Sequence, residues 1–194
     1  MGEKTEIQEE ATLIFVPAKA ILLYPTIDPD GRGGYDECTE DAMRYMVADF
    51  EDRKCSQPDA VVVLTNTFDG GRLPLGYCTG LSVSLAKHPT EGELLALHGT
   101  FLIRSEVAEA LQASFLSGEI RPAIGGTYLS FEVEQRLIGK VRTVTKARLR
   151  QVALIDRADA MQPTRIWLTP EEPEIAVQIE AAALTPPEDS PAGS

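Results

Sequence analysis

Hydrophobic and polar positions between residues 94 and 118 predict a strand followed by a helix. Leu94 to Ile103 is an apolar run of strand length. Ser105 can cap a helix, because its hydroxyl can accept hydrogen bonds from the free N–H groups of the first turn. Gly118 stands where a helix C-terminus favours a left-handed residue. We therefore expect a helix near Ser105–Leu116. Its apolar face is formed at helical spacing by Val107, Ala108, Leu111 and Phe115.

The next stretch predicts a tight glycine turn and another strand. Ala123-Ile124-Gly125-Gly126 supplies the turn, because glycine adopts turn conformations without steric cost. Leu129, Phe131 and Val133 then alternate with polar or aromatic residues, which predicts a strand with one buried face.

Similar signals run along the rest of the chain. A second helix is expected near Thr39–Arg53, with Thr39 as its cap and one face formed by Met43, Met46, Val47 and Phe50. Pro25–Gly34, rich in Asp, Pro and Gly, predicts a loop. Further short strands are expected at Thr12–Val16, Ala20–Tyr24, Ala60–Leu64, Lys140–Thr145, Leu149–Ile155 and Thr164–Leu168, with Pro17 breaking the first pair.

These signals predict an α+β, mainly β fold. We expect a compact six- to seven-stranded barrel-like domain over residues 12–168, with two or more flanking helices. An acidic N-terminal tail, residues 1–11, precedes the domain. An acidic, proline-rich C-terminal arm, residues 169–194, follows it.

The composition narrows the classes of partner. A net charge of −12 argues against nonspecific binding to nucleic acid, which needs cations to meet phosphates. There is no apolar run of about 18 residues, so no membrane partner is expected. The three cysteines, Cys38, Cys55 and Cys78, lack metal-ligand spacing, and there is no glycine-rich phosphate loop. We therefore expect no cofactor and no metal.

The C-terminal arm has a possible binding strand. From Thr169 to Ser194 there are six acids and five prolines and no Lys or Arg. Ile175, Val177 and Ile179 alternate with polar or small residues. This pattern predicts either a strand that adds to a neighbour's sheet or an edge strand of the chain's own domain. The two interpretations stay open, and the three residues are the candidate partner-binding residues.

Several short motifs occur in an order that resembles a known family. An Asp/Gly-rich loop at 28–31 precedes the helix expected at Thr39, and 64–69 follows a strand. Pro74-Leu75-Gly76 closes the next loop, and Ile124-Gly125 comes after the helix that ends at Gly118. With the strand expected at 149–155, residues 12–168 resemble the tailed-bacteriophage prohead (capsid maturation) proteases, which have a herpesvirus-assemblin-like serine protease fold.

The resemblance also implies three catalytic positions. The family's serine, which stands before the Ile-Gly pair, corresponds to Ala123 in this sequence. Its histidine corresponds to Thr67, and its orienting acid corresponds to Gln151. A methyl group is no nucleophile, Thr67 cannot act as a base near neutral pH, and Gln151 cannot carry a negative charge. We therefore expect a degenerate site without catalytic residues.

Neither histidine is expected to rescue catalysis. His88 lies in Lys87-His88-Pro89-Thr90, which predicts a surface turn. His98 lies inside an apolar strand, where a lone histidine is more often structural than a base.

Three functions are compatible with this sequence. The first is a non-catalytic prohead-protease-like structural protein, either in capsid assembly or as a minor or decoration protein of the capsid. Its partners would be capsid or scaffold protein and further copies of itself, in a virion or procapsid assembled in the host cytoplasm. The second is an active maturation protease that cleaves scaffold or capsid protein. The third is an unrelated soluble binding domain.

Overall fold

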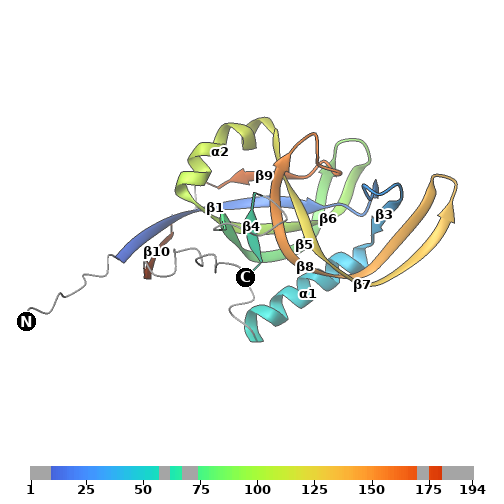
Figure 1. The fold of residues 1–194 in the computed structure, drawn as a ribbon, viewed down its shortest axis with the longest axis horizontal. Coiled ribbons are helices and arrows are strands. Elements are labelled where there is room, and N and C mark those ends of the chain that lie inside the picture. Colours follow the sequence, from blue (N-terminus) through green and yellow to red (C-terminus); the bar gives the residue numbers. More distant parts are fainter. Residues whose placement is uncertain (1–9, 57–61, 67–73, 170–174, 181–194) are drawn as a thin grey trace, which may run out of the picture.

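The computed structural model describes residues 10–56, 62–66, 74–169 and 175–180, with backbone alone for 10–12 and 175–180. This part contains ten strands and two helices, so the predicted α+β, mainly β class is confirmed, with more strands than the expected six or seven (Figure 1). The elements are β1 (Glu10–Leu23), β2 (Ile27–Pro29), β3 (Tyr35–Cys38), α1 (Glu40–Ser56), β4 (Val63–Thr65), β5 (Gly76–His88), β6 (Gly92–Arg104), α2 (Ser105–Ser117), β7 (Ile120–Arg136), β8 (Gly139–Asp156), β9 (Arg165–Leu168) and β10 (Ile175–Glu180).

The strands form one mixed sheet. Its order is β10-β1-β6-β5-β4-β8-β3-β2, with β7 also paired to β8 and β9 also paired to β1. Strand β8 pairs in parallel with both β3 and β4, and antiparallel with β7. The sheet is not closed. Where β7 and β9 approach, Thr164 Oγ1 donates to the Pro122 carbonyl (2.7 Å), but no ladder joins these strands in the described residues. The domain is therefore an open sheet rather than a complete barrel.

The two helices cover different parts of this sheet (Figure 1). The predicted α1 stripe is confirmed, because Met43, Met46 and Phe50 are buried. Helix α2 buries Ala108 and Phe115. These side chains join a core with Phe101 of β6 and Leu149 of β8, and burial of this apolar area is the main stabilising term. Among the described residues, no helix is long and apolar enough to cross a membrane.

The helix ends agree only in part with the predicted caps. Thr39 Oγ1 accepts from the Ala42 N–H (3.2 Å), which confirms the cap of α1. Gly118 is left-handed, with φ 71°, which confirms the end of α2. The prediction for Ser105 is wrong: it is the first helical residue, Arg104 is the N-cap, and no side chain caps this end.

Two predicted interruptions are continuous strand. Strand β1 runs through Pro17, whose carbonyl accepts from the Thr169 N–H (2.9 Å). The missing N–H of Pro17 points to that same edge. There β10 pairs with β1 up to Phe15, and β9 pairs with β1 from Ala18 onward. Proline is tolerated at this position because it lies between the two ladders.

The expected turn at Gly125-Gly126 is also strand. Both glycines lie within β7, and the register of β7 against β8 shifts between them. A Cβ on Gly126 would collide with the Arg148 carbonyl of β8, so glycine is required there by the close approach of two backbones.

The outer halves of β7 and β8 form a hairpin that extends beyond the helices (Figure 1, right). We call residues 127–146 the hairpin arm. Six of its apolar side chains are exposed, although Val141 and Val144 are buried: Tyr128, Leu129, Phe131, Val133, Leu137 and Ile138. The predicted buried face at Leu129, Phe131 and Val133 is therefore wrong, because this part of β7 extends beyond the core.

Candidate functional site

The hairpin arm borders a cleft made of three adjoining cavities. Their volumes are about 370, 570 and 380 Å³. Asp30 lines all three. Asp36 and Tyr128 line the first two, and Arg142 lines the second and third. We call this continuous space the β7 cleft.

One long wall of the β7 cleft is strand β7. Its residues 122–128 line the first two cavities, and Ala147, Arg148 and Leu149 of its partner β8 also line the second. In the described residues β7 pairs with β8 alone, so its second edge carries no ladder. Apart from Pro122, which has no N–H and whose carbonyl accepts from Thr164 Oγ1, the backbone groups on this edge are available to an extended segment.

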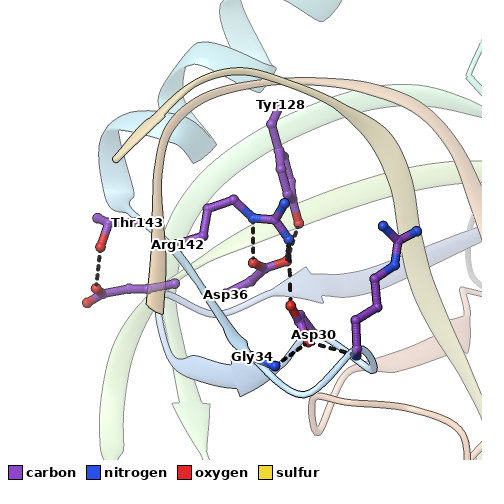
Figure 2. Close-up of polar contacts among 8 residues, drawn as sticks. Asp30, Gly34, Asp36, Tyr128, Arg142 and Thr143 are labelled. Atoms are coloured by element: carbon purple, nitrogen blue, oxygen red, sulfur yellow. Dashed lines mark hydrogen bonds and ion pairs between the residues drawn. The ribbon is translucent and has the colours of Figure 1, made fainter. Parts of the chain in front are cut away.

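A charged network fixes β3 to the hairpin arm (Figure 2). Arg142 Nε and Nη2 donate to the two carboxylate oxygens of Asp36, at 2.8 and 3.1 Å. The Tyr128 hydroxyl donates to Asp36 Oδ2 at 2.7 Å. The Arg142 guanidinium also lies over the rings of Tyr128 (4.8 Å) and Phe131 (5.7 Å). These contacts tie β3 to both strands of the arm.

Asp30 shapes the loop between β2 and β3. Its Oδ1 accepts from the N–H groups of Arg32 (2.7 Å) and Gly34 (2.8 Å), as Figure 2 shows. These backbone hydrogen bonds hold the pKa of the Asp30 carboxyl below its usual value. Gly33, with φ 88°, supplies the left-handed residue that the loop requires. Asp30 Oδ2 also lies 4.0 Å from Arg142 Nη2, so the loop faces the network.

Tyr128 and Arg142 are held in one protonation state near neutral pH. Burial, then the hydrogen bond to Asp36, raises the pKa of Tyr128 well above its usual value. The hydrogen bond to Asp36 raises the pKa of Arg142 further. Burial raises the pKa of the Cys38 thiol, which lines the first cavity, to about 12. Tyr128 and Cys38 therefore stay neutral, and neither is suited to exchange protons at pH 7.

The positions implied by the family resemblance fall on neighbouring strands. Ala123 on β7 lines the first cavity and pairs across from Ala153 on β8. Gln151 lies two residues before Ala153, so the strand alternation puts it on the same face as Ala123. Thr65 of β4 also pairs with Ala153. Thr67 lies outside the described residues. The structure thus brings Ala123 and Gln151 together on one face of adjacent strands.

The histidines lie away from the cleft. His88 is 8 % exposed, so the predicted surface setting is wrong for its side chain, although the turn after it is present. Its Nδ1 accepts from the Thr90 and Glu91 N–H groups, and its ring packs edge-on against Tyr24. His98, on β6, has no hydrogen-bond partner at Nε2 within the part of the chain that the structure describes. Neither histidine lines the three cavities. Within the described ranges, no group of His, Cys, Asp and Glu could hold a metal ion.

The candidate partner strand pairs within its own chain. Ile175, Val177 and Ile179 lie on β10, opposite Phe15, Leu13 and Ala11 of β1. Of the two open interpretations, the backbone matches an edge strand of the chain's own domain. The outer edge of β10 carries no ladder in the described part of the chain.

The network residues were not identified from the sequence. Asp36 and Arg142 are 106 positions apart and meet because β3 and β8 pair in parallel. The alternating cations Lys140, Arg142, Lys146, Arg148 and Arg150 were a usable signal, because an isolated cationic strand in an acidic chain indicates partners elsewhere in the fold. Arg148 indeed pairs with Asp49 of α1 (2.9 Å).

Comparisons with known proteins gave no relatives: no family model matches the sequence, and no curated protein or solved structure matches it.

Proposed function

We propose that this chain is a non-catalytic binding protein of the prohead-protease type, acting in capsid assembly or on the capsid of a bacteriophage. It would act by binding capsid or scaffold protein. The bacteriophage setting comes from the sequence resemblance. The binding role is supported by one observation above all: strand β7, whose second edge carries no ladder in the described residues, lines a cleft at Ala123, the position that the resemblance assigns to the nucleophile.

The chemistry of the β7 cleft favours binding over cleavage. Ala123 offers only a methyl group where acyl transfer needs a nucleophile. Cys38 is a neutral thiol, because its pKa is about 12. The Thr164 hydroxyl is buried and donates to the Pro122 carbonyl. No histidine lines the cavities to activate any of these groups.

The geometry favours an extended protein segment as the occupant. The free β7 edge offers main-chain hydrogen bonds along the cleft, as in strand addition. Leu129, Phe131 and Val133, each 45–48 % exposed, continue the same strand and offer apolar contacts. Isolated edge strands of this length usually carry protective charges. Here Glu132 and Glu134 alternate with the apolar residues, so part of the edge is protected and part is available.

A co-sedimentation assay with assembled capsid and scaffold proteins tests this proposal. The double variant Leu129→Lys, Val133→Lys places cations on the exposed strand and should reduce co-sedimentation at least tenfold. Leu116→Lys is the matched control, because Leu116 is 75 % exposed but lies on α2. It should bind as the wild type does.

Two outcomes would overturn the proposal. If the wild type does not co-sediment at any salt concentration, the chain does not act by binding capsid or scaffold protein. If scaffold fragments appear, the chain is an active protease. Equal loss in the Leu116→Lys control would contradict the role of the β7 edge.

A further inference from the structure

We propose that Arg121, Arg157 and Arg165 form a binding site for a small multivalent oxyanion of the phosphate type, at the corner where β9 meets the ends of β7 and β8 (Figure 1). This site is separate from the β7 cleft and independent of the proposed function. None of the three arginines lines the cleft's cavities.

Strand pairing brings the first two arginines together. Arg121 of β7 pairs across from Ile155 of β8. The Arg157 N–H, two residues further along, donates to the Glu119 carbonyl (2.6 Å). The antiparallel register therefore continues past the end of β8, and Arg121 and Arg157 are diagonal neighbours on one face.

Hydrogen bonds bring the third arginine to the same corner. Arg121 Nη1 donates to the Gln162 carbonyl (3.2 Å), and Thr164 Oγ1 donates to the Pro122 carbonyl (2.7 Å). Residues 162–164 therefore run alongside 121–122, and Arg165 follows directly. The pKa of Arg121 is lowered first by burial and then by the positive charges of Arg157 and Arg165.

In the described residues, no carboxylate lies within ion-pair distance of this cluster. Five other arginines, Arg53, Arg104, Arg136, Arg142 and Arg148, form ion pairs with carboxylates. No ion pair joins Arg121, Arg157 or Arg165 to a carboxylate in the part of the chain that the structure describes. Glu119 shares the face of Arg121 and Arg157 but pairs with neither.

One donor of the cluster is unsatisfied by the protein. Arg121 Nε is buried and has no hydrogen-bond partner among the described residues. An unsatisfied buried donor of a charged group costs free energy, which a bound acceptor would recover. The chain has a net charge of −12, so three arginines without ion-pair partners in the described residues form a local region of positive charge.

The chemistry of guanidinium identifies the ligand class. Its planar fork of N–H donors matches the oxygens of phosphate and carboxylate, with paired, charge-assisted hydrogen bonds. Three such groups converging on one corner suit a compact anion with several oxygens. A nucleic acid would have to approach the remaining, strongly acidic surface, which disfavours it.

The test is calorimetric titration of the full chain with inorganic phosphate, with sulfate and citrate as separate arms and ionic strength held constant with sodium chloride. We expect saturable 1:1 binding of phosphate. Citrate binding at least as tight would identify a carboxylate ligand instead of phosphate, and would overturn the phosphate assignment.

Arginine-to-glutamine variants test whether phosphate binds at this corner. Arg157→Gln and Arg165→Gln change exposed residues and should each weaken phosphate binding about tenfold or more. Arg150→Gln is the control, because Arg150 is exposed on β8 and has no ion pair among the described residues. It should bind as the wild type does. Absence of saturable binding, or equal affinity in Arg165→Gln and Arg150→Gln, would overturn the proposal, whether or not an Arg121 variant folds.

Discussion

Arg142 and Asp36 are register partners on the parallel strands β8 and β3, and their side chains form two hydrogen bonds of 2.8 and 3.1 Å. The pair has a third member, because the Tyr128 hydroxyl donates to the same carboxylate from β7. One interaction thus joins the short β2–β3 segment to both strands of the hairpin arm.

Removing this guanidinium should loosen the cleft. Arg142→Met keeps much of the side-chain volume but deletes both charge-assisted hydrogen bonds. The two side chains are 30 % and 22 % exposed, so we expect a loss of about 1–2 kcal/mol in the free energy of unfolding. Urea denaturation measures it. Arg150→Met, an exposed arginine on the same strand, should change stability by less than about 0.5 kcal/mol. Equal effects from the two variants would show that the pair contributes nothing specific.

Two cysteines should contribute to a loss of stability in alkaline solution. Burial raises the pKa of Cys38 and of Cys78 from the ordinary 9.0 to about 12. The folded protein therefore holds these protons more tightly than the unfolded chain. Their contribution is complete below pH 9 and is lost as the pH rises from 9 towards 12. In this pH range the two thiols together should lower the free energy of unfolding by up to about 2.7 kcal/mol per pH unit.

Urea denaturation between pH 8 and pH 11 checks this slope. The double variant Cys38→Ala, Cys78→Ala should flatten it, even though it is less stable at pH 8. Cys55→Ala removes an exposed thiol and should keep the slope. An unchanged slope in the double variant would mean that other groups cause the alkaline loss.

Two glycine substitutions should differ in cost. Gly126→Ala puts a methyl group against the Arg148 carbonyl inside the β7–β8 ladder, and we expect a loss on the order of 3 kcal/mol. Gly118→Ala meets no atom within 4 Å and has only its left-handed backbone to oppose it. That should cost about 1 kcal/mol. Thermal or urea unfolding distinguishes them, and the reverse order would refute the close backbone approach at Gly126.

Deletion of residues 170–194 should leave a folded domain. Among the described residues, strand β10 pairs with Glu10–Phe15 of β1 alone, and apart from Phe15 the buried core lies between Ala18 and Ile166. We expect the melting temperature to change by less than about 4 °C. Circular dichroism on heating gives the value. A truncated chain that fails to fold would show that β10 belongs to the stable core.

Sequence patterns predict the structure correctly where the residues of a single element determine its conformation. The α1 stripe of Met43, Met46 and Phe50 and the left-handed Gly118 are examples. Pro17 and Gly126 were misread as interruptions, because what permits them in strands is the position of neighbouring strands. The sequence around Pro17 does not indicate that β10 and β9 will pair with the same edge of β1 and leave a gap between them.

The residues of the candidate site also divide into those that a local pattern predicts and those that depend on strand pairing. Ala123 was found by its place after a helix and before an Ile-Gly pair, and it does line the cleft. Asp36 and Arg142 were not found, because their relationship depends on a parallel pairing across 106 positions. The free edge of β7 could not be predicted either, since an edge is defined by the absence of a neighbour in space.

A single sedimentation experiment tests the central claim most directly. The full chain is incubated with capsid and scaffold proteins, assembled particles are pelleted, and the pellet and supernatant are resolved by denaturing gel electrophoresis. The account predicts that the chain appears in the pellet while capsid and scaffold proteins keep their full lengths. Cleaved scaffold or capsid protein, or a chain that stays entirely in the supernatant, would contradict it.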